Sequence, residues 1–228
     1  MRSSFLIAAL FVLVPISASA TPIMEATVEG WPWKFPIPAG FCAVDPTKPS
    51  DKPFFEVETK LAPPSVIVAS LMYECDGLEK LRKGERSPVK ELSYVVAKDE
   101  SLTPFVRLLS RLEYIHAMVQ QIPVAGTANL ANDAAKQIKD KAGLAASVPR
   151  FSLIAQDEYA FYGAALTNVA VPGHDGIVSI ASVSGGTKIG MHLFTVRLIE
   201  LYDTDKVYEP MLAAVKATTK AFLLANPH

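Results

Sequence analysis

The sequence predicts an α+β fold, an α/β/α sandwich with a mainly antiparallel sheet and a long carboxy-terminal helix. Four strand-like runs follow one another between residues 150 and 202, and short turn-forming segments join them, which indicates an antiparallel meander. Segments with helical periodicity precede these runs, and a last helix covers about residues 207–225. Helices in this order can cover both faces of the sheet.

The first twenty residues have the three zones of a secretory signal peptide. Arg2 supplies a positive charge, an apolar run extends from Phe5 to Val14, and small residues then end in an A-x-A site. We therefore expect cleavage between Ala20 and Thr21. The remainder, residues 21–228, has the length of one domain.

An uncleaved membrane anchor is the alternative interpretation of this segment. A helix needs about 20 apolar residues to cross a bilayer, whereas Pro15 interrupts this run after ten. No later stretch of the sequence approaches 18 apolar residues without a charge. We expect a periplasmic or secreted protein with no membrane span after signal cleavage.

Charge argues against a nucleic-acid partner. The chain has 22 basic and 23 acidic side chains. Loss of Arg2 with the signal leaves a net charge of −2. Such a balance produces no field that attracts nucleic acid or an anionic membrane.

The two cysteines, Cys42 and Cys75, favour a disulfide, because an even cysteine count in an exported protein indicates pairing. The bond would close a loop of about 34 residues and contribute about 3–4 kcal/mol. A redox-active pair and two separately buried thiols are the alternatives. These cysteines do not have the C-x-x-C spacing that is typical of a redox-active pair.

The amino-terminal half begins with a proline- and aromatic-rich stretch, residues 21–40. Its prolines exclude a helix or a central strand, so we expect an extended edge segment whose rings pack on the domain. Ser50 or Asp51 is expected to cap the first helix, with Pro53 in its first turn. The predicted elements are a strand at 40–44, a helix at 52–61, a strand at 66–73, a helix at 76–83 and a strand at 90–98.

One amphipathic helix is predicted from Thr103-Pro104 to Pro123, with an apolar stripe that includes Leu108 and Leu112. His116 lies on or beside this stripe and is expected to be a packed core histidine. A weaker helix is expected at 132–144.

The later strands are predicted at 151–155, 159–169, 177–183 and 188–202. Gly185-Gly186 is interpreted as the hairpin turn between the last two. Asp205 is the expected cap of the final helix, which carries Met211, Leu212, Val215, Phe222 and Leu223 on one side.

Several short motifs resemble those of a group of uncharacterised exported bacterial proteins over about residues 35–85. They are Gly40-Phe41-Cys42, Pro49-Ser50-Asp51, Cys75-Asp76-Gly77-Leu78 and Arg82-Lys83-Gly84. The element order of most of the mature chain resembles the Mog1/PsbP-like sandwich. That resemblance implies an accessory or interaction protein. No PsbP functional residue can be matched here, and fold alone does not fix function.

A search for chemistry finds no motif that assigns a catalytic, cofactor or metal residue. The histidines His116, His174, His192 and His228 lack metal-ligand spacing, and His192 lies in a strand that could face either way. His174-Asp175 fits a turn better than a catalytic pair. The sequence also lacks a G-x-S-x-G elbow and both phosphate-binding glycine motifs.

The favoured hypothesis is a non-catalytic binding or accessory protein with an unknown protein or small-molecule partner. Its surface would lie at Trp31 and Trp33, which with Phe35 form an aromatic platform or pack in the core, or at residues 125–131. The alternative is a hydrolase or isomerase with a histidine beside a carboxylate in a cleft. A third is a structural accessory protein of envelope stress that binds no small ligand.

Overall fold

A computed structural model describes residues 21–85, 90–121, 145–146, 150–170 and 177–227. The predictions made for residues 1–20, 125–131 and 132–144, for His174 and for His228 lie outside these residues. Within them, no helix combines the length and apolar character needed to cross a bilayer.

The amino-terminal half alternates short strands and short helices. Its elements are β1 (Ile23–Val28), β2 (Trp31–Pro36), β3 (Phe41–Ala43), α1 (Lys52–Leu61), β4 (Val66–Glu74), α2 (Cys75–Arg82), β5 (Glu91–Ala97), the 3-10 helix η1 (Asp99–Ser101), α3 (Pro104–Leu108) and α4 (Arg111–Gln121).

The carboxy-terminal half is mostly sheet and ends in one long helix. Its elements are β6 (Ala145–Ala146), β7 (Arg150–Gln156), β8 (Phe161–Ala170), β9 (Ile177–Ile189), β10 (His192–Leu201), the 3-10 helix η2 (Asp205–Val207) and α6 (Tyr208–Ala225).

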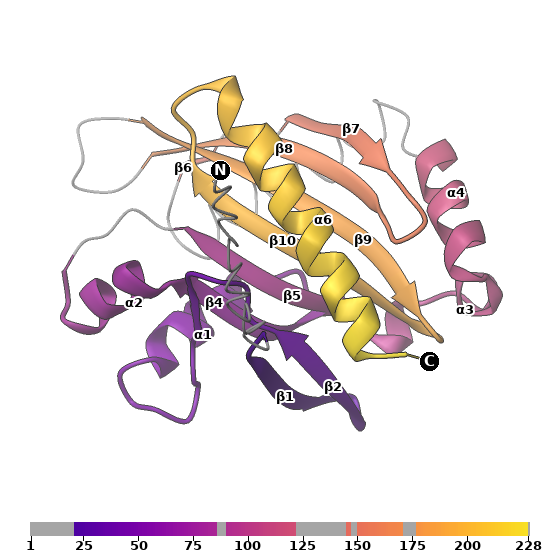
Figure 1. Ribbon diagram of the computed structural model, residues 1–228, viewed down its shortest axis with the longest axis horizontal. Coiled ribbons are helices and arrows are strands. Elements are labelled where there is room, and N and C mark those ends of the chain that lie inside the picture. Colours follow the sequence, from indigo (N-terminus) through magenta and orange to yellow (C-terminus); the bar gives the residue numbers. More distant parts are fainter. Residues whose placement is uncertain (1–20, 86–89, 122–144, 147–149, 171–176, 228) are drawn as a thin grey trace, which may run out of the picture.

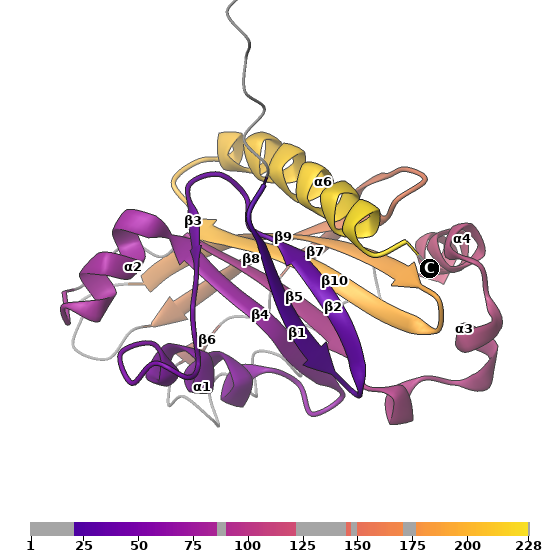
Figure 2. The ribbon, with the colours of Figure 1, turned by 60° about the horizontal axis from the view of Figure 1, so that its bottom comes forward.

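One eight-stranded sheet organises the molecule, in the order β3-β4-β5-β10-β9-β8-β6, with β7 also paired to β8. Every pairing is antiparallel. Helix α6 and the separate β1–β2 hairpin cover one face (Figure 1). Helices α1, α2 and α4 lie toward the other, and Figure 2 shows α6 and α1 on opposite sides of the sheet. The predicted α+β sandwich is confirmed.

Residues 21–40 fold back on themselves as the β1–β2 hairpin, which the sequence prediction of a single extended segment missed. The turn residues Glu29 and Gly30 both have positive φ, 52° and 83°, as a two-residue type I′ turn requires. Prolines are tolerated in β2 because a two-stranded sheet consists only of edge strands. Two of the three predicted rings, Trp33 and Phe35, are buried.

The predicted helix from residue 104 is interrupted and becomes α3 and α4. Ser110 and Glu113 form a reciprocal capping box that starts α4: the Ser110 backbone N–H donates to the Glu113 carboxylate at 2.7 Å, and the Glu113 N–H to Ser110 Oγ at 3.3 Å. The break rotates the predicted stripe outward, so that Leu108 is 85% exposed. His116 is exposed and pairs with Gln120, which corrects the prediction of a core histidine.

The glycine pair Gly185-Gly186 lies inside β9, and the turn to β10 falls at Gly190-Met191. A Cβ on Gly186 would lie 2.3 Å from the Phe161 ring, and a Cβ on Gly185 would lie 3.0 Å from Tyr162. These glycines therefore make room for two rings on opposite faces of the sheet. The hairpin predicted at this pair is wrong because packing, rather than turn geometry, requires glycine here.

Helix α6 packs through the apolar side that the sequence predicts, with Met211, Val215, Phe222 and Leu223 buried. The Phe222 ring contacts the rings of Phe35, Tyr94 and Phe194, with centroids 5.7, 5.2 and 4.9 Å away. This cluster joins the hairpin, the sheet and α6. Asp205 does not cap the helix, because its carboxylate accepts the Tyr202 hydroxyl.

Cys42 and Cys75 form the predicted disulfide, which links β3 to the first residue of α2. Asp51 precedes α1 as predicted, but its side chain makes no cap hydrogen bond. Its carboxylate instead accepts hydrogen bonds from Nε and Nη2 of Arg82 in α2, at 2.8 and 2.7 Å. The disulfide and this ion pair hold the same corner of the sandwich together.

Candidate functional site

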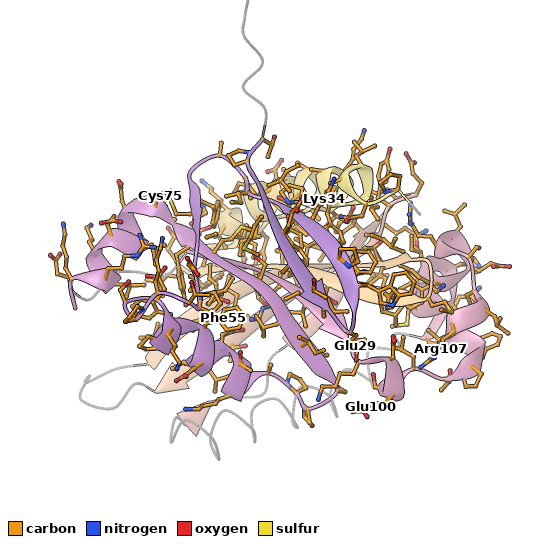
Figure 3. All side chains as sticks on the ribbon, turned by 90° about the horizontal axis from the view of Figure 1, so that it is seen from below. Glu29, Lys34, Phe55, Cys75, Glu100 and Arg107 are labelled. Carbon is orange, nitrogen blue, oxygen red and sulfur yellow. A yellow bond between two sulfur atoms is a disulfide. The ribbon has the colours of Figure 1, made fainter. Side chains whose placement is uncertain are left out.

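Three turns far apart in the sequence meet at one end of the sheet. Because Phe194 of β10 lies opposite Val96 of β5, the start of β10 reaches the end of β5, where η1 begins. The tip of the β1–β2 hairpin lies over the same place, and Figure 3 shows Glu29 at this tip near Glu100 of η1. Figure 2 shows the same approach from another side.

Glu29, Asp99 and His192 face one another at this meeting point. One ligand atom from each lies within 4.8 Å of the other two. The Glu29 carboxylate also accepts the Asp99 backbone N–H at 3.0 Å, which fixes the hairpin tip to η1. Glu29 is the non-glycine residue with positive φ in the described chain. A glutamate in this conformation carries strain that a turn glycine or asparagine would avoid.

His192 is the buried member of the cluster, 6% exposed. Its Nδ1 lies 3.3 Å from Asp99 Oδ1. Its ring packs edge-on against Trp31 and Trp33, with centroids 5.5 and 5.3 Å away. The imidazole is thus held on one side by indole rings and on the other by a carboxylate that reaches solvent.

The two tryptophans have different positions. Trp33 is 3% exposed, and its ring centroid lies 4.6 Å from that of Phe194, so Trp33 belongs to the core. Trp31 is 50% exposed and covers the outer side of His192. Of the two residues predicted to form an interaction surface, Trp31 therefore offers the accessible ring and Trp33 supports it from below.

Three basic side chains close to the cluster in the fold donate hydrogen bonds to backbone carbonyls. The buried Lys188 donates from Nζ to Arg107 O at 3.1 Å and to Gly190 O. Burial lowers the pKa of Lys188. Arg107 donates to the carbonyl of Asp99, and Arg111 Nε donates to the carbonyl of Lys188 at 2.9 Å. These bonds fix the turn before His192 and the start of η1.

His116, the other candidate histidine that the structure describes, lines a cavity of about 350 Å³ with Asp157 and Glu158. Its Nε2 pairs with Gln120 Nε2 at 2.7 Å. Asp157 accepts the backbone N–H of Tyr159 at 2.9 Å and the Tyr162 hydroxyl at 3.1 Å, so its carboxylate stabilises a turn. A larger cavity, about 690 Å³, lies between α1 and β4 and is lined mainly by apolar residues with Lys60 and Lys98.

A second polar cluster lies toward α1 on the opposite face of the sheet from α6. The Arg197 guanidinium contacts the carboxylates of Glu58 and Glu91, the latter at 3.4 Å, and Ser93 Oγ at 3.3 Å. Burial, together with the nearby charge of Glu58, raises the pKa of Glu91 to about 7. Two carboxylates thus share one arginine, and the buried one releases its proton near neutral pH.

Replacing Glu91 with glutamine is expected to flatten the pH dependence of stability between about pH 5 and 8. The pKa of Glu91 is higher in the folded state than the ordinary value of 4.5, so its contribution is fully present below pH 4.5 and is lost as pH rises through 7. Glutamine resembles the protonated acid. We expect the free energy of unfolding of E91Q to exceed that of the wild type by about 1–3 kcal/mol at pH 8.

Urea unfolding at several pH values measures this effect. Glu200→Gln is the matched control, because Glu200 pairs with Lys90 at 3.3 Å near the sheet surface and its loss should leave the pH slope unchanged. An E91Q protein that keeps the wild-type slope would contradict the assignment.

No protein-family model matches the chain, and no curated protein matches it. The solution structure of cyanobacterial PsbP (CyanoP) from Synechocystis sp. PCC 6803 is similar, with a TM-score of 0.40 and 12% identity over 92% of this chain and 94% of that chain. No function is carried over from this structure.

Proposed function

We propose that this is an exported, non-catalytic binding protein, and that Trp31 with the Glu29–Asp99–His192 cluster forms its binding site. The observation that carries the proposal is a large indole ring, half exposed and held against a buried histidine, next to two carboxylates. Binding sites typically combine an aromatic contact surface with a few convergent polar groups.

The site is supported by rigid elements, as selective binding requires. The hairpin that carries Trp31 is fixed to the core by Phe35, and the Tyr94 hydroxyl donates to Pro36 O at 2.8 Å. An exposed tryptophan on such a support loses little conformational freedom when a ligand covers it. Tryptophan is accordingly enriched among residues that dominate binding energy.

Export is supported by two features. The amino terminus has the secretory pattern. Disulfides such as Cys42–Cys75 persist in oxidising compartments outside the cytoplasm.

Catalysis by the same residues is the second candidate, because Asp99 beside His192 resembles a base and the group that orients it. A hydrolase of the serine or cysteine type also needs a hydroxyl or thiol hydrogen-bonded to the histidine. In the described part of the chain, the contacts of the His192 ring are with a carboxylate and two indoles. This environment favours binding over nucleophilic catalysis.

Trp31→Ala tests the proposed function. Purified mature protein is screened by thermal shift and tryptophan fluorescence against a defined panel of organic acids, sugars and amino acids. We expect at least one compound to raise the melting temperature, and W31A to weaken its binding by about 30-fold, a loss typical of an aromatic hot spot. Phe105→Ala, which removes another exposed ring, should bind normally.

Equal binding by W31A and the wild type would place the ligand elsewhere. The absence of any shift across the panel would count against a small-molecule binding protein.

A further inference from the structure

We propose that Glu29, Asp99 and His192 form a binding site for a divalent transition-metal ion, of which Zn²⁺ is the best fit. This inference rests on the proposed function and names the ligand class of the same site. It is carried by the convergence of one imidazole and two carboxylates from three separate turns.

The geometry suits a small cation. Two donor atoms bound at about 2.1 Å around a tetrahedral ion lie about 3.4 Å apart, and His192 Nδ1 is 3.3 Å from Asp99 Oδ1. The same separation is long for a hydrogen bond, whose usual range ends at about 3.2 Å. All three donor atoms lie within 4.8 Å of one another, so bringing the exposed Glu29 carboxylate to a donor separation of about 3.4 Å shortens its distances by at most about 1.4 Å.

The donor types narrow the choice of ion. Imidazole nitrogen favours Zn²⁺, Cu²⁺, Fe²⁺ or Ni²⁺, whereas Ca²⁺ and Mg²⁺ prefer sites built from oxygen alone. A metal ion binds the carboxylate form of an acid and the neutral form of imidazole, so a divalent ion bound by these three ligands would have its charge balanced by two carboxylates. Arg107 and Lys188, which contact the turns that carry Asp99 and His192, donate to backbone carbonyls.

The surroundings resemble those of a metal site with an open position. Asp99 is partly exposed and Glu29 is exposed, so an ion can enter and solvent can complete its coordination. The Asp99 backbone N–H orients the Glu29 carboxylate, as outer hydrogen bonds commonly orient metal ligands. The bound ion would tie the strained tip of the hairpin to η1 and to β10.

A functional consequence follows for Trp31. Its ring lies on His192, and only Gly30 separates Trp31 from Glu29 in the sequence. Metal binding would therefore fix the position of the exposed indole and should change its fluorescence.

Calorimetry on the untagged mature chain with Zn²⁺ alone tests the site. We expect one ion per chain, with a change in tryptophan emission and a higher melting temperature. Loss of an outer-sphere partner of a metal typically weakens binding by about 10–100-fold, so Asp99→Asn and His192→Gln should weaken Zn²⁺ by about 100-fold or more. Ca²⁺ should bind more weakly than Zn²⁺.

Glu29→Gln guards against loss of folding, because Glu29 is exposed and its replacement should leave the metal-free melting temperature close to that of the wild type. It should still weaken Zn²⁺ by about 10-fold. His116→Gln, at an exposed histidine elsewhere, is the matched control and should bind Zn²⁺ as the wild type does.

Zn²⁺ binding that is unaffected by E29Q and D99N, or that is lost in H116Q, would overturn the proposal. Failure of Zn²⁺ to bind, combined with an organic ligand whose affinity depends on Trp31, would reject the metal site and leave the proposed binding function intact. Failure of both would reject both.

Discussion

Loss of the Cys42–Cys75 disulfide is expected to lower the free energy of unfolding by about 3–4 kcal/mol. The bond joins residues 33 positions apart, and the loop it closes contains α1 and β4. In the reduced unfolded chain this loop would regain its conformational freedom, which is the main source of disulfide stabilisation in the chain-entropy model. Urea unfolding of the Cys42→Ser/Cys75→Ser double variant measures the loss.

Reductant provides the internal control for this experiment. Wild-type protein in dithiothreitol should unfold at the urea concentration of the double variant, and the double variant should not respond to dithiothreitol. A difference of less than about 1 kcal/mol between oxidised and reduced protein would mean that β3 and α2 are held mainly by other contacts.

Asp51→Asn is expected to lower stability by about 2–4 kcal/mol, because charge-assisted hydrogen bonds to a buried carboxylate are lost. The Asp51 side chain is 0% exposed and pairs with Arg82. It also accepts the Ser50 hydroxyl at 2.8 Å and the Asp45 backbone N–H at 3.1 Å. The Arg82 hydrogen bonds hold the pKa of Asp51 well below its ordinary value. Denaturant unfolding at pH 7 measures the loss.

Glu79→Gln is the matched control, since Glu79 binds the same Arg82 at 2.8 Å but is 59% exposed. We expect it to change stability by less than about 0.5 kcal/mol. Because the pKa of Asp51 is lowered in the folded state, its contribution is present above about pH 4 and is lost as pH falls further. The gap between D51N and the wild type should therefore narrow in acid, and a gap that stays constant to pH 3 would contradict this explanation.

Most helices and strands could be predicted because their boundaries are set locally. Pro53 and the pair Pro63-Pro64 delimit α1, and Gly84 with positive φ follows α2. The break between α3 and α4 was also readable from the Ser110–Glu113 capping box, but the continuous apolar stripe favoured one helix. The role of Gly185-Gly186 inside a strand could not be predicted, because the rings that require glycine there belong to a neighbouring strand.

The candidate site could be predicted only in part. Trp31 was singled out for its aromatic neighbours, and His192 was placed in a strand whose facing was undecided. Glu29 and Asp99 carry no local signal for a site, and they meet His192 only through the pairing of β5 with β10 and the folding back of the hairpin. Such convergence depends on register across the sheet, which one sequence does not specify.

The Asn226 side chain forms hydrogen bonds with the backbone of β2, as a neighbouring strand would. Its amide accepts the Lys34 N–H at 3.0 Å and donates to the Lys34 carbonyl at 2.8 Å, across 192 positions of sequence. Asn226 follows all the described strands in the sequence, so the residue that completes this pairing is the last of its partners to be synthesised. A chain that stops short of Asn226 would lose both hydrogen bonds to Lys34 but would keep the Phe35 and Tyr94 contacts that hold the hairpin on the sheet.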